Sequence, residues 1–337
     1  MPSGNKHKRM ALSRRNKQLV GRYALLAIAG MALQLFLGDV DASFLFYPWS
    51  IIVAINYLYI LILFYVKSDS VKCLRRLYDR PAMLTSLASM LVLTLLFGLI
   101  RQDGSTDGFC GWLGFTRMTS SWIFILFLVH FTTVIGLKAV EDVHRWKQRR
   151  LPVVLMHVSS FVILASAIVS SGEKVRVRVT TAIDAPISMG VTEDRRVYEL
   201  PFTLTLKEFI LEEYPPQVVV VDGREMVMPR REVKKFLSRV TVTDEDGAEE
   251  VEILVNHPAR IGAWRIYQSG YDSSRGKDST ISILECVKDA WYPAVHVAMW
   301  LILIAGAWMM FGGWKVQNKK KEGKIWMQSL HKLILAR

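Results

Sequence analysis

Three of the seven histidines lie inside long apolar runs of the sequence, where an ionisable side chain is costly to bury: His130, His157 and His296. Such a residue in a membrane span is expected to be functional. A neutral imidazole in apolar surroundings suits the iron of haem, whose large ring a bundle of helices can bury. The alternative is a hydrogen bond between each imidazole and a polar group of another helix. The residues alone leave both possibilities open.

His157 has surroundings that suit a position inside protein. It lies five residues after Pro152, and a helix rises about 1.5 Å per residue, which places His157 ~8 Å above the start of its span. The imidazole is predicted to face another helix rather than lipid, because its helical face includes small and polar residues. That face is formed with Ser160, Leu164, Ala167 and Ser171.

The other two histidines are predicted at different depths. His130, with Thr132 and Thr133 close behind it, lies near mid-membrane, and His296 lies within about two turns of the outer boundary. Along the membrane normal, His130 and His157 then differ by ~6 Å, whereas His296 and His157 differ by ~16 Å. One planar haem could be shared by the first pair but not by the second.

Helices that span a membrane must position these side chains. The chain of 337 residues is 51% hydrophobic, and it contains six apolar stretches long enough to cross a bilayer. We therefore predict an integral α-helical membrane protein. The predicted spans are Tyr23 to Gly38, Phe44 to Val66, Met83 to Ile100, Trp122 to Leu137, Leu151 to Val169 and Trp291 to Trp314.

The charged segments between the spans predict the orientation. Four short segments hold 24 of the 43 basic residues: 1–22, 67–81, 138–150 and 315–337. Because Lys and Arg accumulate in cytoplasmic segments, these four are predicted to be cytoplasmic together with both termini. The region 23–171 then forms five helices, and residues 291–314 form the sixth.

The net charge of +13 follows from this topology and requires no nucleic acid as a partner. The lipid bilayer is the predicted environment of the basic segments. The tail 315–337 either lies on anionic lipid or acts as a solvated topology signal, and the sequence favours neither. The first apolar run has no small-residue cleavage site after it, so we expect it to be retained as a helix.

Residues 172–290 predict one β-rich extracytoplasmic domain inserted before the last helix. Short β-branched or alternating runs are separated here by Gly, Asp and Pro turns. The segment LPFTLTLKEFILEEYPP is predicted to form a short strand and then a helical turn, closed by Pro215 and Pro216.

The segment VNHPARIGAWRIYQSGYD, which we term the YQ segment, is predicted to form two strands. Strand alternation places Trp264, Ile266 and Gln268 on one face, with Arg265, Tyr267 and Ser269 on the other. Structural roles are favoured for its polar side chains, and we expect Asn256, Tyr267 and Gln268 to satisfy backbone groups.

The three cysteines predict neither a zinc site nor covalently attached haem, since no CxxCH or zinc spacing is present. Cys73 is expected to be cytoplasmic and reduced, whereas Cys110 and Cys286 lie outside and could form a disulfide. The sequence also has no nucleotide-binding loop, nucleophile elbow or zincin pattern, so no catalytic residue is assigned.

Several stretches together resemble the ResB family, also called CcsB, of System II cytochrome c maturation. LMHVSSFVILASAIVSSGEKVRVRV is similar to the family's last helix before its outer domain. LPFTLTLKEFILEEYPP and the YQ segment resemble two family signatures, the second including Asn256, Tyr267, Gln268 and Tyr271. The resemblance covers roughly residues 20–315. Family members commonly have four spans in this component, so Met83 to Ile100 and Trp122 to Leu137 form an apparent extra pair.

The resemblance implies a subunit of a cytochrome c haem lyase complex, either non-catalytic or haem-ligating, in the bacterial cytoplasmic (inner) membrane. The complex moves haem b across the membrane and presents it to apocytochrome c in the periplasm. His157 matches the family's transmembrane haem ligand, so the metal it would hold is haem iron. The second axial ligand belongs to a CcsA/ResC-type membrane partner, which also carries a tryptophan-rich WWD motif.

Two other functions remain open at this stage. The chain could be a membrane cytochrome b subunit for electron transfer, with His130 and His157 as a self-contained pair of haem ligands. It could instead be a non-catalytic assembly or scaffold protein whose β-domain binds another protein. His130 and His296 are further candidate haem ligands in the membrane region, and the family resemblance assigns neither of them.

Overall fold

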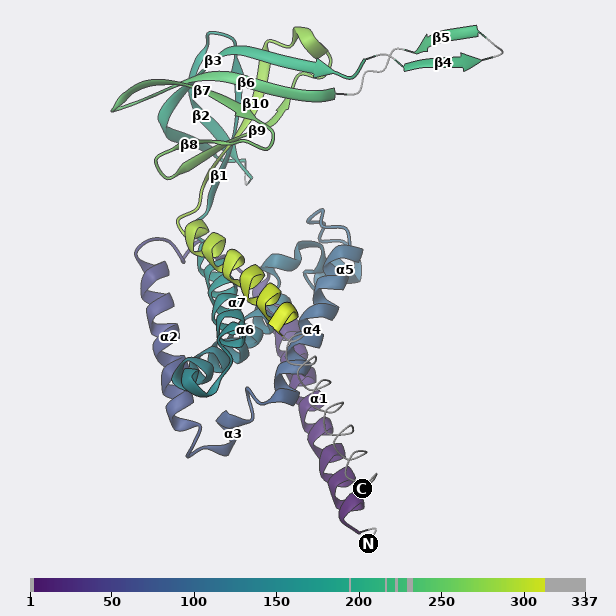
Figure 1. Ribbon diagram of the computed structural model, residues 1–337, viewed down its shortest axis with the longest axis vertical. Coiled ribbons are helices and arrows are strands. Elements are labelled where there is room, and N and C mark those ends of the chain that lie inside the picture. The colour runs from purple at the N-terminus through teal and green to yellow at the C-terminus, as the bar shows by residue number, and fades with distance from the viewer. Residues whose placement is uncertain (1–2, 194, 216, 222–223, 229–232, 313–337) are drawn as a thin grey trace, which may run out of the picture. The chain divides into compact units, whose positions relative to one another are not determined.

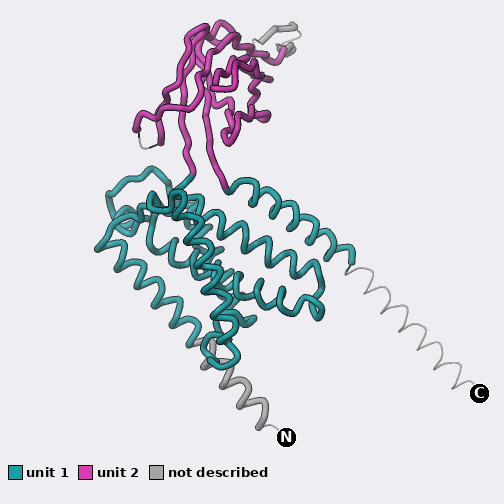
Figure 2. Tube along the Cα trace, turned by 90° about the vertical axis from the view of Figure 1, so that its left-hand side faces the viewer, with its two compact units in different colours: residues 1–173, 291–337 teal, residues 174–290 magenta. Residues whose placement is uncertain are grey.

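The chain folds into two compact units, which Figure 2 shows in different colours. The computed structural model describes residues 3–193, 195–215, 217–221, 224–228 and 233–312. Residues 1–173 and 291–337 belong to the first unit, which we term the membrane unit. The second unit, residues 174–290, is termed the β-unit.

The described part of the membrane unit contains six helices that are long and apolar enough to cross a bilayer, which confirms the predicted fold class. Two short helices lie in the connections (Figure 1). The helices are α1 (Ser3–Leu37), α2 (Trp49–Lys67), α3 (Lys72–Arg75), α4 (Arg80–Leu99), α5 (Gly108–Trp112), α6 (Trp122–His144), α7 (Leu151–Ser170) and the final helix Tyr292–Gly312. The expected tail 315–337 lies outside the described residues.

Helix α6 is the central helix of the membrane unit. It packs against α1, α2, α4 and α7. Within its most apolar window 44% of the residues are buried, compared with 22% or less in the other spans. Its buried side chains include Phe127, Val134 and Leu137, which contact the surrounding helices. Residues on α6 are therefore held more firmly by protein contacts than residues on the lipid-facing helices.

Local capping residues fix where two of these helices begin. Asp79 is the N-cap of α4 and accepts a hydrogen bond from the backbone N–H of Ala82, with Pro81 in the first turn. Ser121 caps α6 in the same way, by accepting from the N–H of Phe124. These polar caps satisfy backbone donors that would otherwise be unpaired at the ends of apolar helices.

The β-unit contains one curled antiparallel sheet of eight strands in the order β7-β6-β3-β2-β1-β10-β9-β8. Because β7 also lies against β8 and β9, the ends of the sheet meet and give it a barrel-like form (Figure 1). The strands are β1 (Val175–Ala182), β2 (Pro186–Thr192), β3 (Val197–Glu213), β6 (Val233–Asp244), β7 (Gly247–Leu254), β8 (Ala259–Ile261), β9 (Trp264–Tyr271) and β10 (Ile281–Lys288). A separate hairpin is formed by β4 (Gln217–Val221) and β5 (Arg224–Met228).

The helical turn predicted within LPFTLTLKEFILEEYPP is wrong, because this segment lies in the long strand β3. Residues Leu200 to Leu206 alternate regularly between buried and accessible positions. The register then shifts between Leu206 and Glu208, and the buried positions resume at Phe209 and Leu211. This bulge breaks the period of two, so the alternation that marks a strand is interrupted within the segment.

The YQ segment has the strand faces that the sequence predicted. Trp264, Ile266 and Gln268 are all buried, and Arg265 and Tyr267 between them are partly accessible. The first of its two strands, β8, is only three residues long and joins β9 through Gly262, whose φ of +54° favours glycine. Trp264 and Ile266 belong to the core of the β-unit with Val177, Leu204 and Leu284.

All three cysteines have free thiols, so the possible pairing of Cys110 with Cys286 is not present in the structure. Cys286 is fully buried in the core of the β-unit, and this burial raises the pKa of its thiol to about 12. Cys73 and Cys110 are exposed. Thiolate is the reactive form, so Cys286 is expected to react with a maleimide at least about tenfold more slowly than the other two. Mass spectrometry of each labelled cysteine, native and unfolded, measures this difference, and equal native rates would contradict it.

Candidate functional site

His157 contacts a buried carboxylate on the neighbouring helix. Its Nδ1 lies 2.7 Å from Oδ2 of Asp142, which is near the end of α6. The Asp142 side chain is fully buried, whereas 20% of the His157 side chain is exposed. The prediction that this imidazole faces another helix is therefore confirmed, and the structure identifies the group that it contacts.

Two cations hold the other oxygen of the same carboxylate. Lys138 Nζ lies 3.2 Å and Arg149 Nε 3.3 Å from Oδ1 of Asp142. Both cations also reach Glu141, at 2.6 Å and 3.4 Å respectively. We term these five residues, Lys138, Glu141, Asp142, Arg149 and His157, the α6–α7 charge cluster. Burying a carboxylate is costly unless it is paired, and these two cations compensate that cost.

The antiparallel arrangement of α6 and α7 brings the charge cluster together. Helix α6 ends at His144 and α7 begins at Leu151, so the end of one helix lies beside the first turns of the next. Pro152 at the start of α7 is compatible with the first helical turn, which lacks intrahelical partners for its N–H groups. Next to the cluster, Phe161 packs against Tyr57 of α2, with ring centroids 6.2 Å apart. These contacts fix the face of α7 that carries His157.

The hydrogen bond to Asp142 determines which imidazole nitrogen is available. A carboxylate only accepts hydrogen bonds, so Nδ1 of His157 must carry the proton and donate it. In the neutral imidazole the Nε2 atom then has a free lone pair, and it makes no hydrogen bond to any residue that the structure describes. This carboxylate–histidine arrangement is the one in which metal-ligating histidines are commonly found, because the second partner fixes the tautomer and the ring orientation.

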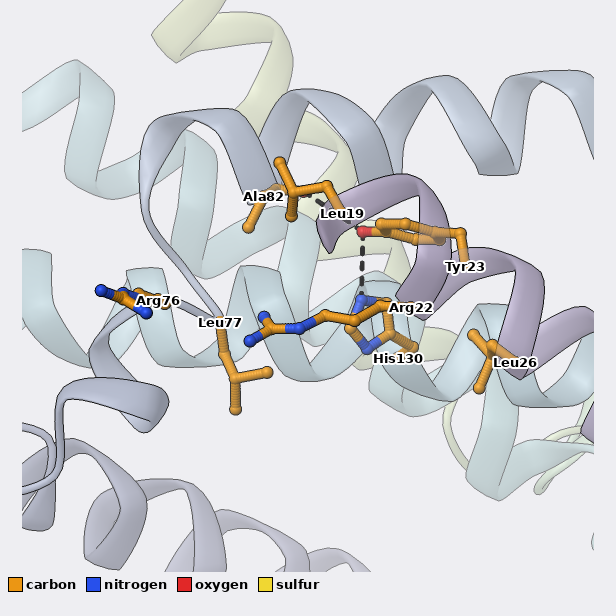
Figure 3. Close-up of a pocket in the computed structure, with 8 residues that line it drawn as sticks. All are labelled: Leu19, Arg22, Tyr23, Leu26, Arg76, Leu77, Ala82 and His130. Atoms are coloured by element: carbon orange, nitrogen blue, oxygen red, sulfur yellow. Dashed lines mark hydrogen bonds between the residues drawn. The ribbon is translucent and has the colours of Figure 1, made fainter. Parts of the chain in front are cut away.

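His130 is engaged elsewhere in the membrane unit. Its Nε2 lies 3.1 Å from the hydroxyl of Tyr23 on α1, and the two rings meet edge to face at 5.3 Å. Figure 3 shows this contact together with the bond from Tyr23 to the carbonyl of Ala82. Nε2 of His130 is therefore occupied by a hydrogen bond.

His296 lies on the final helix between two aromatic residues one turn away on either side. Its ring stacks on Tyr292 at 5.6 Å, and its Nε2 accepts a hydrogen bond from Nε1 of Trp300 at 3.2 Å. The side chain is exposed. The contacts of His296 are local to its own helix, and they leave no free nitrogen at Nε2.

The structure does not bring the three histidines together. His130 and Asp142 are twelve residues apart on α6, which corresponds to ~18 Å along the helix axis. A haem shared by two imidazoles requires both to point at one iron from opposite sides. His157 points at Asp142 and His130 at Tyr23, so the shared haem inferred from a ~6 Å difference in depth lacks the necessary geometry.

The polar residues of the YQ segment lie in the β-unit and have different surroundings. Gln268 donates hydrogen bonds to the carbonyl of Gly270 and to the hydroxyl of Ser282, as expected for a structural role. Tyr271 stacks on Phe209 with ring centroids 5.1 Å apart. Asn256 is exposed in the turn before β8, and neither Asn256 nor Tyr267 bonds a backbone group among the described residues. For these two, the expected bonds to backbone groups are not among those that the structure describes.

Comparison with known protein families gives one match. Residues 145–293 match the model of the ResB-like family. This part of the chain is therefore similar to the ResB-like family. The matched ResB-like region includes His157 and the whole β-unit, but not His130, Asp142 or His296.

The comparison with solved structures gives a weaker similarity. A chain described as cytochrome c haem lyase CcmF matches over 77% of this chain at 11% sequence identity and a TM-score of 0.31. The matched part is 45% of that chain, so this protein spans less than half of its length. No curated protein matches the sequence. The ResB-like region is therefore the basis for the functional assignment.

Sequence reasoning missed Asp142, the residue that completes the site. The prediction placed Asp142 in a basic cytoplasmic segment, 138–150, where acidic residues were counted only as charge. A usable signal was present, since Lys138, Glu141 and Asp142 directly follow an apolar run at spacings of three and four residues. The helix α6 extends through them to His144, beyond the predicted end at Leu137.

Proposed function

We propose that this membrane protein takes part in cytochrome c biogenesis by binding haem b, as a transported substrate, through His157 Nε2. The family of the region 145–293 supports a role in that process. The observation that carries the haem site is the hydrogen bond between His157 and the buried Asp142, because it leaves Nε2 free for iron.

The second axial ligand is proposed to come from another protein. His130 and His296 both use Nε2 in hydrogen bonds, so neither offers the described site a second free Nε2. His157 is 20% exposed, which gives a neighbouring chain access to the imidazole. A CcsA/ResC-type membrane protein with a WWD motif is the proposed partner. The geometry therefore favours a haem held between subunits over a self-contained cytochrome b.

The β-unit is proposed to lie in the periplasm, where it supports attachment of haem to apocytochrome c. The inner membrane of a bacterium is the proposed location, with both termini in the cytoplasm, since the basic segments favour that orientation. Thioether formation needs reduced haem and reduced thiols in alignment, so the contribution of the β-unit is to position its partners. The chain itself is proposed to ligate haem without providing a catalytic residue.

The substitution Asp142→Asn tests the observation that carries this function. Asparagine keeps the size of the side chain but loses the charge that holds the Nδ1 proton, so haem affinity is expected to fall by about 10- to 100-fold. Titration of the purified protein with haem, followed by its absorbance spectrum, measures the change. Asp142→Glu is expected to restore part of the affinity, because it returns the carboxylate.

Glu141→Gln is the matched control for that experiment. Glu141 belongs to the same charge cluster and contacts Lys138 and Arg149, but it makes no contact with His157. Haem affinity is therefore expected to be close to that of the unchanged protein. If Asp142→Asn and Glu141→Gln lower haem affinity equally, the cluster only joins α6 to α7, and the role of Asp142 in positioning the imidazole is wrong.

A further inference from the structure

A second polar site lies in the membrane unit, apart from the charge cluster. It is a cavity of about 160 Å³ between α1, the segment that joins α3 to α4, and α6. Figure 3 shows the side chains that line it. The lining residues are Leu19, Arg22, Tyr23, Leu26, Arg76, Leu77, Ala82 and His130.

Two guanidinium groups of this cavity have no acidic partner among the described residues. They belong to Arg22 of α1 and Arg76, which follows α3, and Figure 3 shows the Arg22 side chain extended toward Leu77. The adjacent Arg75 is different, because its NH1 lies 3.7 Å from Asp69. Arg22 lies within the first apolar span, where an ionisable side chain requires a partner or water. The cavity thus offers positive charge that the described part of the protein does not neutralise.

The other walls of the cavity are mostly apolar. Leu19, Leu26 and Leu77 supply hydrocarbon, and the hydroxyl of Tyr23 is bonded to Nε2 of His130 at 3.1 Å. A ligand of this cavity must therefore combine an anionic group for the arginines with an apolar part for the leucines. An inorganic anion would make no use of the apolar walls.

We propose that this cavity binds the head group of an anionic phospholipid. The phosphate would lie between Arg22 and Arg76, and an acyl chain would run along the leucines toward the surrounding bilayer. Basic pockets between transmembrane helices bind phospholipid head groups in this way. The cavity lies at the end of the helices where α1 enters its span and α4 begins, and that end carries the basic segments 1–22 and 67–81. The proposal does not depend on haem binding by His157.

Lipid retention by the purified full chain tests this proposal. The protein is placed in nanodiscs of phosphatidylglycerol and phosphatidylcholine, extracted into detergent, and its bound lipids are counted by native mass spectrometry. Phosphatidylglycerol is expected to be retained in preference. In the double variant Arg22→Gln and Arg76→Gln its affinity is expected to fall by roughly 20- to 30-fold, since each basic residue contributes about a factor of five. Each single variant is expected to show part of that loss.

Arg75→Gln is the matched control, because Arg75 is adjacent in sequence and already paired with Asp69. Its retention of phosphatidylglycerol is expected to equal that of the unchanged protein. Equal losses in the control and the double variant would overturn the proposal. Displacement of the lipid by millimolar inorganic phosphate would assign the cavity to free anions instead. Loss of haem from the double variant, with lipid retained, would assign it to the haem propionates.

Discussion

Replacing His157 with alanine is expected to remove haem from the purified protein and to stop the maturation of c-type cytochromes. The substitution removes the only described imidazole whose Nε2 is free while Nδ1 is held by a buried carboxylate. Losing a ligand costs more than losing its hydrogen-bond partner, so the fall in haem affinity is expected to exceed about 100-fold. Haem absorbance of the purified protein and haem staining of cellular c-type cytochromes measure the two effects.

His130→Ala is the control for the first prediction. This imidazole is bonded to Tyr23, so its loss is expected to leave the haem content and the cytochromes unchanged. Added imidazole is expected to restore haem binding to His157→Ala, because it supplies a ligand to the vacated position. Loss of haem in both variants would support a self-contained cytochrome b. Normal maturation and unchanged haem absorbance in His157→Ala would leave only a scaffold role for the protein.

Gly30→Leu is expected to destabilise the membrane unit strongly. A Cβ atom at Gly30 would lie 2.8 Å from the backbone Cα of Ile123, so α1 and α6 could not keep their present separation. Glycine allows such close approach between membrane helices, where packing supplies much of the association energy. We expect the free energy of unfolding to fall by about 3 kcal/mol, which is at the upper end for overpacked interiors. Unfolding in detergent mixtures, monitored by circular dichroism, measures it.

Gly98→Leu is a matched substitution on another span of the same unit. A Cβ atom at Gly98 would have no heavy atom within 4 Å, apart from its chain neighbours and its own helix backbone. Its stability is expected to change by less than about 0.5 kcal/mol, as for most surface substitutions. If both leucine variants unfold at the same detergent composition, the contact between α1 and α6 at Gly30 contributes little to the stability of the fold.

The helices and the β-unit could be predicted because their patterns are local. Each span is an apolar run long enough to cross a bilayer, and the predicted start of α4 at Met83 lies three residues from its start at Arg80. The faces of strand β9 could be predicted residue by residue, because its buried and accessible positions alternate without interruption up to Ser269. In β3 the bulge after Leu206 interrupts the alternation, and the prediction was wrong there. Periodicity cannot locate a bulge, because the extra residue depends on the partner strand.

The sequence predicted His157 of the candidate site but not its partner Asp142. His157 is conspicuous in the sequence as an ionisable residue in an apolar run, but its partner Asp142 lies in a charged segment where acidic residues are ordinary. Only the pairing of α6 with α7 shows that this carboxylate is buried. The depths of His130 and His157 along the membrane normal were estimated from the predicted boundaries of the spans. Because α6 ends seven residues later than predicted, the estimated difference between the two depths changes.

The strand that leaves the β-unit is the neighbour of the strand that enters it. β1 and β10 pair along their whole length, from Val175 opposite Lys288 to Ala182 opposite Ile281. Paired strands lie about 5 Å apart, so the two ends of the insertion could be joined by a tight turn. At the membrane side, Nε1 of Trp291 donates a hydrogen bond to Glu173 at 2.7 Å. The β-unit can therefore be enlarged, trimmed or exchanged during evolution without moving the helices that flank it.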